Sequence, residues 1–195
     1  IFDVGCATGE LLDYLLMRFP SSNVCGMDAS ERLIQTARKR NPRGEFWTGS
    51  VLDGSNFTDR KYDIVTSTGL LSLMDNPEEF IDNLLSVARR DGMVLVSSPF
   101  NTDPIDLITR YRRAEKNSKI WETGWNIWSM ATIDRHLSTV DYDIDWSWMP
   151  WDPPYPVEKG KDPMRTWTIK TEEKDRQKVN GGGLFLNAHI LAIKV

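Results

Sequence analysis

The chain has 195 residues, 27% of them charged, and a formal net charge of −4 at pH 7. This length predicts one domain with a sizeable core, since domains cluster at about 100–150 residues. The acidic balance argues against nucleic acid or an anionic membrane as a partner, and no apolar run approaches the roughly 20 residues of a membrane helix. Cys6 and Cys25 are interpreted as small buried residues rather than as a disulfide or metal pair, so we expect a cytoplasmic protein without a metal site.

The first ten residues, IFDVGCATGE, predict a nucleotide-binding turn. Residues 1–4 form a buried strand in this interpretation, 5–9 a tight turn, and 10–19 a helix with one apolar face. Backbone N–H groups and the positive end of a helix dipole meet at such a turn, and small residues let a ligand approach the main chain. The alternative is an ordinary tight turn between a strand and a helix.

The spacing of the small residues separates two classes of ligand. The dinucleotide fingerprint G-x-G-x-x-G needs a small residue at position 10, where this chain has Glu10. Here the small residues are Gly5, Ala7 and Gly9, and Asp3 stands two residues before the first of them. This acidic-x-G-x-G-x-G pattern resembles the first motif of class I S-adenosylmethionine (SAM) methyltransferases, with Ala7 in place of the usual middle glycine.

An acid follows the second predicted strand, 23–27, at Asp28. The resemblance assigns Asp28 to the ribose hydroxyls of the cofactor, a task that an acid at this place also performs in dinucleotide sites. The alternative for a lone acid before a helix is simple capping. Ser30 is predicted to cap the helix that follows, which ends at Asn41.

The turn after the third predicted strand, 45–49, is the expected adenine site. In the family this turn often carries an acid for the adenine amino group, followed by a backbone N–H for a ring nitrogen. Position favours Ser50 and Val51 for these roles, and Asp53 is the alternative.

The fourth predicted strand, 62–66, leads into Ser67 and Thr68, which the resemblance places along the methionine part of the cofactor. A helix with Pro77 in its first turn then follows and is predicted to stop at Gly92, before a fifth strand. Together these assignments predict the following cofactor contacts: Asp3, Gly5, Cys6, Ala7, Gly9, Asp28, Ala29, Ser50, Val51, Asp53, Ser67 and Thr68.

The resemblance implies an α/β fold, a three-layer doubly wound Rossmann-like sheet that is mostly parallel with an antiparallel last strand. Residues 1–100 would form the SAM-binding half, and 101–195 the second half of the same domain. The sixth strand is predicted at 141–148, and the seventh at 184–195. The sequence begins inside its first strand, so we expect the N-terminal helices of the family to be missing from this chain.

Two segments, at about 101–128 and 149–183, are predicted to hold the acceptor. They leave the fifth and sixth strands at the carboxyl edge of the sheet, where open α/β folds bind ligands. Of the eight tryptophans, Trp121, Trp125 and Trp151 are among the seven that follow residue 120, and they would form an aromatic wall. The alternative is that these rings only pack an irregular lid.

Two local structures are predicted inside these segments. A helix should start at Pro104, and its arginines, Arg110, Arg112 and Arg113, either bind an anion or form a solvated face. Residues 165–180 should form a hairpin.

The resemblance therefore predicts a bacterial-looking methyltransferase that uses SAM, releases S-adenosylhomocysteine and acts on a small molecule, sugar-like or anionic. The first alternative is a non-catalytic methyltransferase-like binding module, which the departures at Ala7 and Ser50 favour slightly. The second is a nicotinamide-dependent oxidoreductase, against which Glu10 argues. No catalytic base is assigned, because His136 and His189 are interpreted as structural or core residues.

Overall fold

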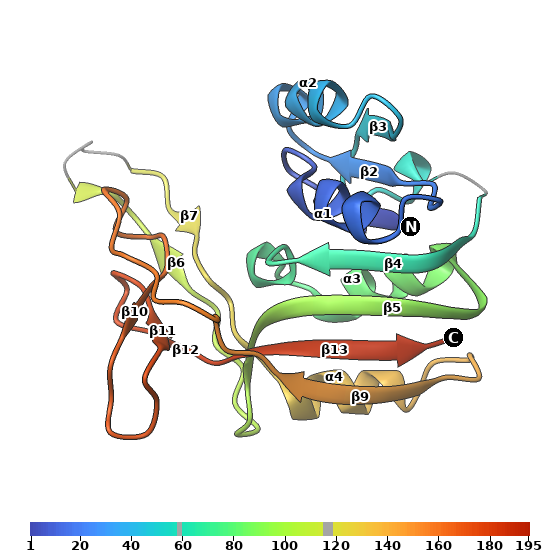
Figure 1. Ribbon diagram of the computed structural model, residues 1–195. Helices are drawn as coiled ribbons and strands as arrows, with labels where there is room; N and C mark the ends of the chain where they lie inside the picture. The colour runs from blue at the N-terminus through green and yellow to red at the C-terminus, as the bar shows by residue number, and fades with distance from the viewer. Residues whose placement is uncertain (58–59, 115–118) are drawn as a thin grey trace.

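The computed structural model describes residues 1–57, 60–114 and 119–195, and a mixed sheet forms its centre (Figure 1). The strand order is β3-β2-β1-β4-β5-β13-β9, and β8 pairs with β5 beyond the end of β4. Its strands are β1 (Phe2–Val4), β2 (Cys25–Asp28), β3 (Glu45–Thr48), β4 (Tyr62–Thr68), β5 (Ala88–Asn101), β8 (Trp128–Ser129), β9 (Asp145–Pro150) and β13 (Ala188–Lys194). Strand β13 runs antiparallel between β5 and β9. The predicted fold class is confirmed.

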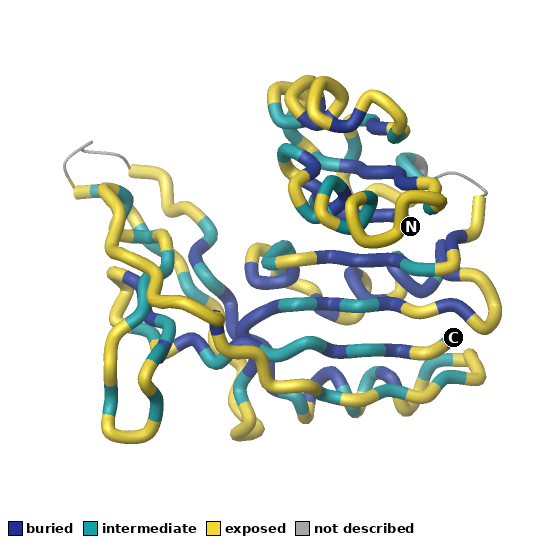
Figure 2. The backbone as a smooth tube through the Cα atoms, in the orientation of Figure 1, coloured by how far each residue is buried: buried dark blue, intermediate teal, exposed yellow. Residues whose placement is uncertain are grey.

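Helices lie on both faces of this sheet (Figure 1). They are α1 (Glu10–Arg18), α2 (Glu31–Arg40), α3 (Pro77–Val87) and α4 (Met130–Leu137). Right-handed crossovers from β1 to β2 and from β2 to β3 place α1 and α2 on one face, and the reversed direction from β4 to β5 places α3 on the other. Two apolar clusters result, one under α1 and α2 and the larger one under α3 and α4. Figure 2 shows that the buried residues concentrate in the central strands.

The prediction that α3 continues to Gly92 is wrong. The helix ends at Val87, and Ala88 already has extended dihedral angles and pairs with Tyr62 of β4. A Cβ atom at Gly92 would lie 2.8 Å from the carbonyl oxygen of Arg89. This glycine therefore permits a close backbone approach inside β5 and does not stop a helix.

The predicted helix from Pro104 is also wrong. Leu107 forms a bridge with Ile127, and β6 (Arg110–Tyr111) pairs antiparallel with β7 (Glu122–Thr123). Ile105 and Ile108 would share one face of such a helix, and both side chains are more than half exposed. A helix at this place would have no apolar layer to pack against, so burial would not stabilise it.

A second, smaller sheet holds the predicted hairpin, which is confirmed. Strands β10 (Trp167–Ile169) and β11 (Gln177–Val179) pair antiparallel, and β12 (Phe185–Leu186) extends them. The stretch predicted as a single seventh strand is therefore divided between β12 and β13. The segment after β5, described at 102–114 and 119–127, and the segment after β9, at 151–187, lie at the carboxyl ends of the parallel strands (Figure 1). We call them the two irregular segments, since short strands and loops alternate in them.

Trp146 and Trp148 fasten β9 to α4. Their indole Nε1–H groups donate to the same carboxylate oxygen, Oδ1 of Asp134, at 2.7 and 2.9 Å, and both rings pack against the larger apolar cluster. Two hydrogen bonds to one charged acceptor hold the edge strand against the helical layer.

Asp134→Ala is expected to lower the free energy of unfolding by about 2–3 kcal/mol, because it leaves two partly buried indole N–H groups without an acceptor. Urea denaturation measures this loss. Asp141→Ala, which removes an exposed acid from the loop before β9, is the control and should change stability by less than about 0.5 kcal/mol. Equal stability of the two variants would contradict the role given to Asp134.

Candidate functional site

In the turn after β1, all three small residues adopt positive φ angles, which larger side chains disfavour. Gly5, Ala7 and Gly9 have φ angles of 79°, 48° and 75°. The N–H groups of Gly5 and Cys6 donate to the carbonyl oxygen of Met27 at 2.7 and 3.0 Å and tie the turn to β2. The left-handed φ explains the alternating small residues in the sequence, since glycine adopts it freely and alanine tolerates it at a modest cost.

The turn leads directly into α1, whose N-terminus has no side-chain cap because Gly9 occupies the N-cap position. The first N–H groups of a helix have no acceptor within that helix, so they are available to a ligand or to water. Asn41, at the end of α2, is buried and donates from Nδ2 to the carbonyl oxygen of Gly9 at 3.0 Å. In the sequence Asn41 marks only the end of a helix, so no local pattern predicts this support.

Asp28 joins the first turn to the second strand. Its Oδ2 accepts the N–H of Ala7 at 3.0 Å, and its Oδ1 accepts the N–H of Ser30 at 2.9 Å. Ser30 occupies the N-cap position of α2 as predicted, but its side chain makes no capping hydrogen bond. Each carboxylate oxygen can accept more than one hydrogen bond, so Asp28 keeps capacity for ligand hydroxyl groups. Ala29 beside it is exposed.

Asp3 and Cys6 lie deeper than a ligand contact would require. Asp3 is 3% exposed and accepts a hydrogen bond from Thr66 Oγ1 at 2.7 Å. Burial raises the pKa of Asp3 to about 6, although the Thr66 hydrogen bond opposes this. Burial and then the nearby carboxylates of Asp3 and Asp28 raise the pKa of Cys6 to about 12, so this group is a thiol. Both side chains are thus buried in this structure, and their predicted contacts with the cofactor stay a prediction.

The turn after β3 lies close to Asp28, whose carbonyl oxygen accepts the N–H of Gly49 at 3.0 Å. Ser50 and Asp53 are exposed, and Ser50 Oγ accepts the N–H of Leu52 at 3.2 Å. The Val51 side chain is buried in the core, so only its backbone could meet a ligand. The adenine role of Ser50, with Asp53 as its alternative, stays a prediction.

The fourth strand is longer than the predicted 62–66, so Ser67 and Thr68 belong to β4 and do not follow it. The Ser67 hydroxyl is buried and donates to the carbonyl oxygen of Val4 at 2.8 Å. Thr68 is exposed at the carboxyl end of the strand, and Gly69 then turns the chain with a φ of 75°. Of the two predicted residues, only Thr68 offers its side chain at the edge of the sheet.

The two histidines lie outside this site. His136 Nε2 is 2.7 Å from Asp82 Oδ1, which links α4 to α3. His189 was interpreted as a core residue, but its ring is only half-buried, and its Nδ1–H donates to the carbonyl oxygen of Asn187 at 3.2 Å. Burial lowers its pKa, so the ring is neutral at pH 7.

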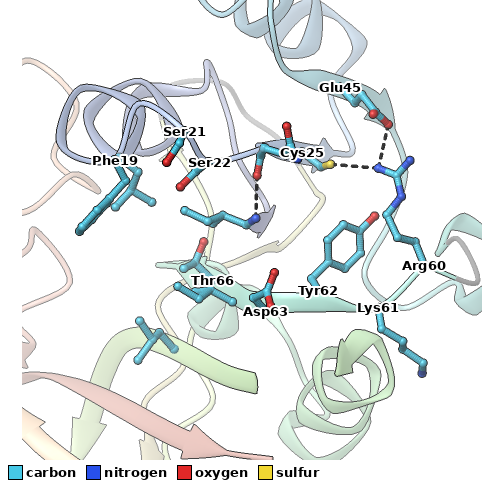
Figure 3. Close-up of a pocket in the computed structure, with 15 residues that line it drawn as sticks. Phe19, Ser21, Ser22, Cys25, Glu45, Arg60, Lys61, Tyr62, Asp63 and Thr66 are labelled. Carbon is cyan, nitrogen blue, oxygen red and sulfur yellow. Dashed lines mark hydrogen bonds and ion pairs between the residues drawn. The ribbon is translucent and has the colours of Figure 1, made fainter. Parts of the chain in front are cut away.

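A cavity of about 930 Å³ lies away from the carboxyl edge (Figure 3). It opens between the end of α1, at Phe19, and the beginning of β4, at Tyr62. On its wall Arg60 Nη1 contacts Glu45 Oε2 at 3.0 Å and Cys25 Sγ at 3.5 Å. Because none of the residues from 3 to 9 lines this cavity, it is separate from the predicted cofactor site.

Comparison with known proteins supports the resemblance to methyltransferases that the carboxyl edge of the sheet suggests. Residues 2–94 match the family model of the methyltransferase domain. Trans-aconitate 2-methyltransferase of Paracidovorax citrulli (strain AAC00-1) is 27% identical over 101 residues, 52% of this chain and 39% of that protein. The similarity thus spans well under half of that relative's length.

Two solved structures share the fold over nearly the whole chain. The complex of DhpI with SAM and HEP has a TM-score of 0.62 at 14% identity, and the match covers 100% of this chain and 77% of the DhpI chain. The plantazolicin methyltransferase BpumL in complex with SAH has a TM-score of 0.59 at 17% identity and covers 99% and 74%. Residues 2–94, just under half of the chain, are therefore similar in sequence to the methyltransferase domain. The predicted resemblance to SAM methyltransferases is confirmed over this part of the chain.

Membrane insertion through a helix finds no support among the described residues, since none of their helices has the length and apolar character to cross a bilayer.

Burial of Asp3 predicts how the stability of the protein depends on pH. Because the pKa of Asp3 in the folded protein is about 6 and that of an unfolded Asp is about 3.9, the folded state holds this proton more tightly. Stability should therefore fall as pH rises from about 4 to 6, by up to about 3 kcal/mol. Asp3→Asn, which keeps an acceptor for Thr66, should remove this part of the fall in urea denaturation.

The control is Asp63→Asn, which changes an exposed acid at the start of β4 and should keep the pH dependence of the unmodified protein. If the Asp3 variant lost stability over the same pH range by the same amount, the raised pKa would be refuted.

Proposed function

We propose that this chain binds SAM at the turn after β1 and at Asp28. It would transfer the methyl group of SAM to a small-molecule acceptor, with S-adenosylhomocysteine as product. When bound, SAM supplies a methyl group on a sulfonium, which a nucleophile of the acceptor can displace in line. The observation that carries the proposal is the left-handed turn at Gly5, Ala7 and Gly9, tied through Ala7 to the Asp28 carboxylate.

The residues at this edge fit such a cofactor. Asp28 offers acceptors for the ribose hydroxyls, and the uncapped N-terminus of α1 offers N–H donors beside it. Thr68 lines the edge at the end of β4, next to the strand that carries the turn. Ser50, or Asp53 in the alternative, would receive the adenine. The site would bind the cofactor through main-chain groups and one carboxylate.

The acceptor would be held by the predicted segments 101–128 and 149–183, whose described parts lie at the same edge (Figure 1). Because the sulfonium is already a strong donor, the work of the protein is alignment of the nucleophile and exclusion of water. The net charge of −4 argues against a nucleic acid as acceptor. A matched relative is named for trans-aconitate, a small molecule, and this supports the same class here.

Asp28→Ala is expected to weaken SAM binding about 10- to 100-fold, since it removes a charged acceptor from the ribose hydroxyls. Calorimetric titration with SAM, S-adenosylhomocysteine and NAD measures the affinity and also tests the nicotinamide alternative. Asp28→Asn keeps one acceptor oxygen and should bind with intermediate affinity. The exposed Asp63→Ala is the control.

A thermal melt of each variant separates loss of binding from loss of folding. A folded Asp28→Ala protein with unchanged SAM affinity would refute the ribose assignment. Tight SAM binding without formation of S-adenosylhomocysteine from any acceptor would favour the non-catalytic module, and binding of NAD in place of SAM would favour the oxidoreductase.

A further inference from the structure

A second cavity, of about 250 Å³, lies where the two irregular segments meet the end of β4. Its wall includes Leu73, in the 3-10 turn η2 (Leu71–Leu73) that follows β4, and Tyr111, Trp125 and Arg165 from the two segments. The proposed methyl donor would lie at the carboxyl ends of β1 and β4, and Leu73 on the cavity wall belongs to the turn that follows the end of β4 at Thr68.

Buried Asn126 fixes the first segment to the turn after β4. Its Oδ1 accepts the N–H of Thr109 at 2.9 Å, and its Nδ2 donates to the carbonyl oxygen of Met74 at 2.9 Å and to Asp75 Oδ1 at 3.0 Å. Its own N–H donates to the carbonyl oxygen of Ser72 at 2.7 Å. A buried side chain with these bonds makes the two parts of the wall one rigid unit.

The second segment is fixed in turn to the first. Trp125 Nε1–H donates to the carbonyl oxygen of Met164 at 2.6 Å, and Arg113 Nη2 binds Asp162 Oδ1 at 2.8 Å. The N–H of Gly181 donates to the carbonyl oxygen of Pro163 at 2.7 Å. These three contacts hold the turn that carries Arg165 at the cavity.

The arginines around this cavity differ in whether their guanidinium groups already have a partner in the protein. Arg110 pairs with Asp75 at 2.5 Å, and Arg113 pairs with Asp162. The guanidinium of Arg112 lies 5.2 Å from the centroid of the Trp121 ring. The three arginines that the sequence offered for an anion are therefore engaged within the protein.

Arg165 differs from them, because it forms no ion pair with any carboxylate in the part of the chain that the structure describes. Its charge helps to lower the pKa of Asp162, after the larger effects of the Arg113 hydrogen bond and the Met164 N–H. That carboxylate is thus already bound by two donors. Arg165 lines the cavity and is exposed, and the described residues give its guanidinium no carboxylate partner, so its donors can serve an anion.

We propose that this cavity binds the methyl acceptor and that Arg165 recognises a carboxylate on it, while a flat ring lies against Trp125 and Tyr111. The planar fork of arginine matches a carboxylate in geometry and charge, and aromatic walls suit a planar body. The inference rests on the proposed function and adds to it the acceptor class, a small aromatic or planar carboxylic acid.

The test compares 4-hydroxybenzoate with 4-hydroxybenzamide, its neutral counterpart of the same shape, by calorimetric titration of the protein saturated with S-adenosylhomocysteine. The unmodified protein should bind the acid at least about tenfold more tightly than the amide. Arg165→Met should abolish this preference and leave the affinity for S-adenosylhomocysteine unchanged. The control is Arg112→Met, a change of an exposed arginine that does not line the cavity, which should keep the preference.

A second variant tests the location without relying on charge. Leu73→Trp fills the cavity from a side chain that is 46% exposed, so it should block both probes and leave S-adenosylhomocysteine bound. Equal affinity for acid and amide, no binding of either, or a preference that survives Arg165→Met would overturn the inference. Failure of S-adenosylhomocysteine itself to bind would instead refute the proposed function.

Discussion

The Asp28 carboxylate holds together the edge on which the proposed activity depends. One oxygen binds the N–H of Ala7 in the first turn, and the other binds the N–H of Ser30 at the start of α2. The turn itself can exist only because small residues adopt positive φ angles on either side of that contact. One charged side chain thus fixes the distance between two strand ends and keeps acceptor capacity for a ligand at the same place.

The second half of the chain depends on a different constraint. Strand β5 extends beyond the end of β4, and β8 pairs with this extension at Phe100. The irregular segments that leave from there have little core of their own, so polar contacts such as those of Asn126 hold them. The first half offers the proposed cofactor site, which is made largely of main-chain groups. The second half offers side chains that could be substituted without disturbing the sheet. Recognition of the acceptor would then be separate from binding of the cofactor.

The first half could be predicted from the sequence because its signals are local. The strand, the glycine turn and the apolar face of α1 lie within twenty residues, and Asp28 stands at the carboxyl end of β2 as its position in the sequence predicts. In the second half the same periodicity predicted a helix after Pro104, although Ile105 and Ile108 have no apolar layer to cover. The bonds that replace it join Asn126 to residues about fifty positions away, and no local pattern reveals such pairs.

A crystal structure of the protein with S-adenosylhomocysteine would show whether the cofactor binds at Asp28. We expect the ligand to lie along the carboxyl ends of β1 and β2, with its ribose hydroxyls within hydrogen-bond distance of the Asp28 carboxylate and its adenine at the turn that follows β3. A ligand bound elsewhere, for example in the 930 Å³ cavity beside Phe19, or one that makes no contact with Asp28, would contradict this expectation.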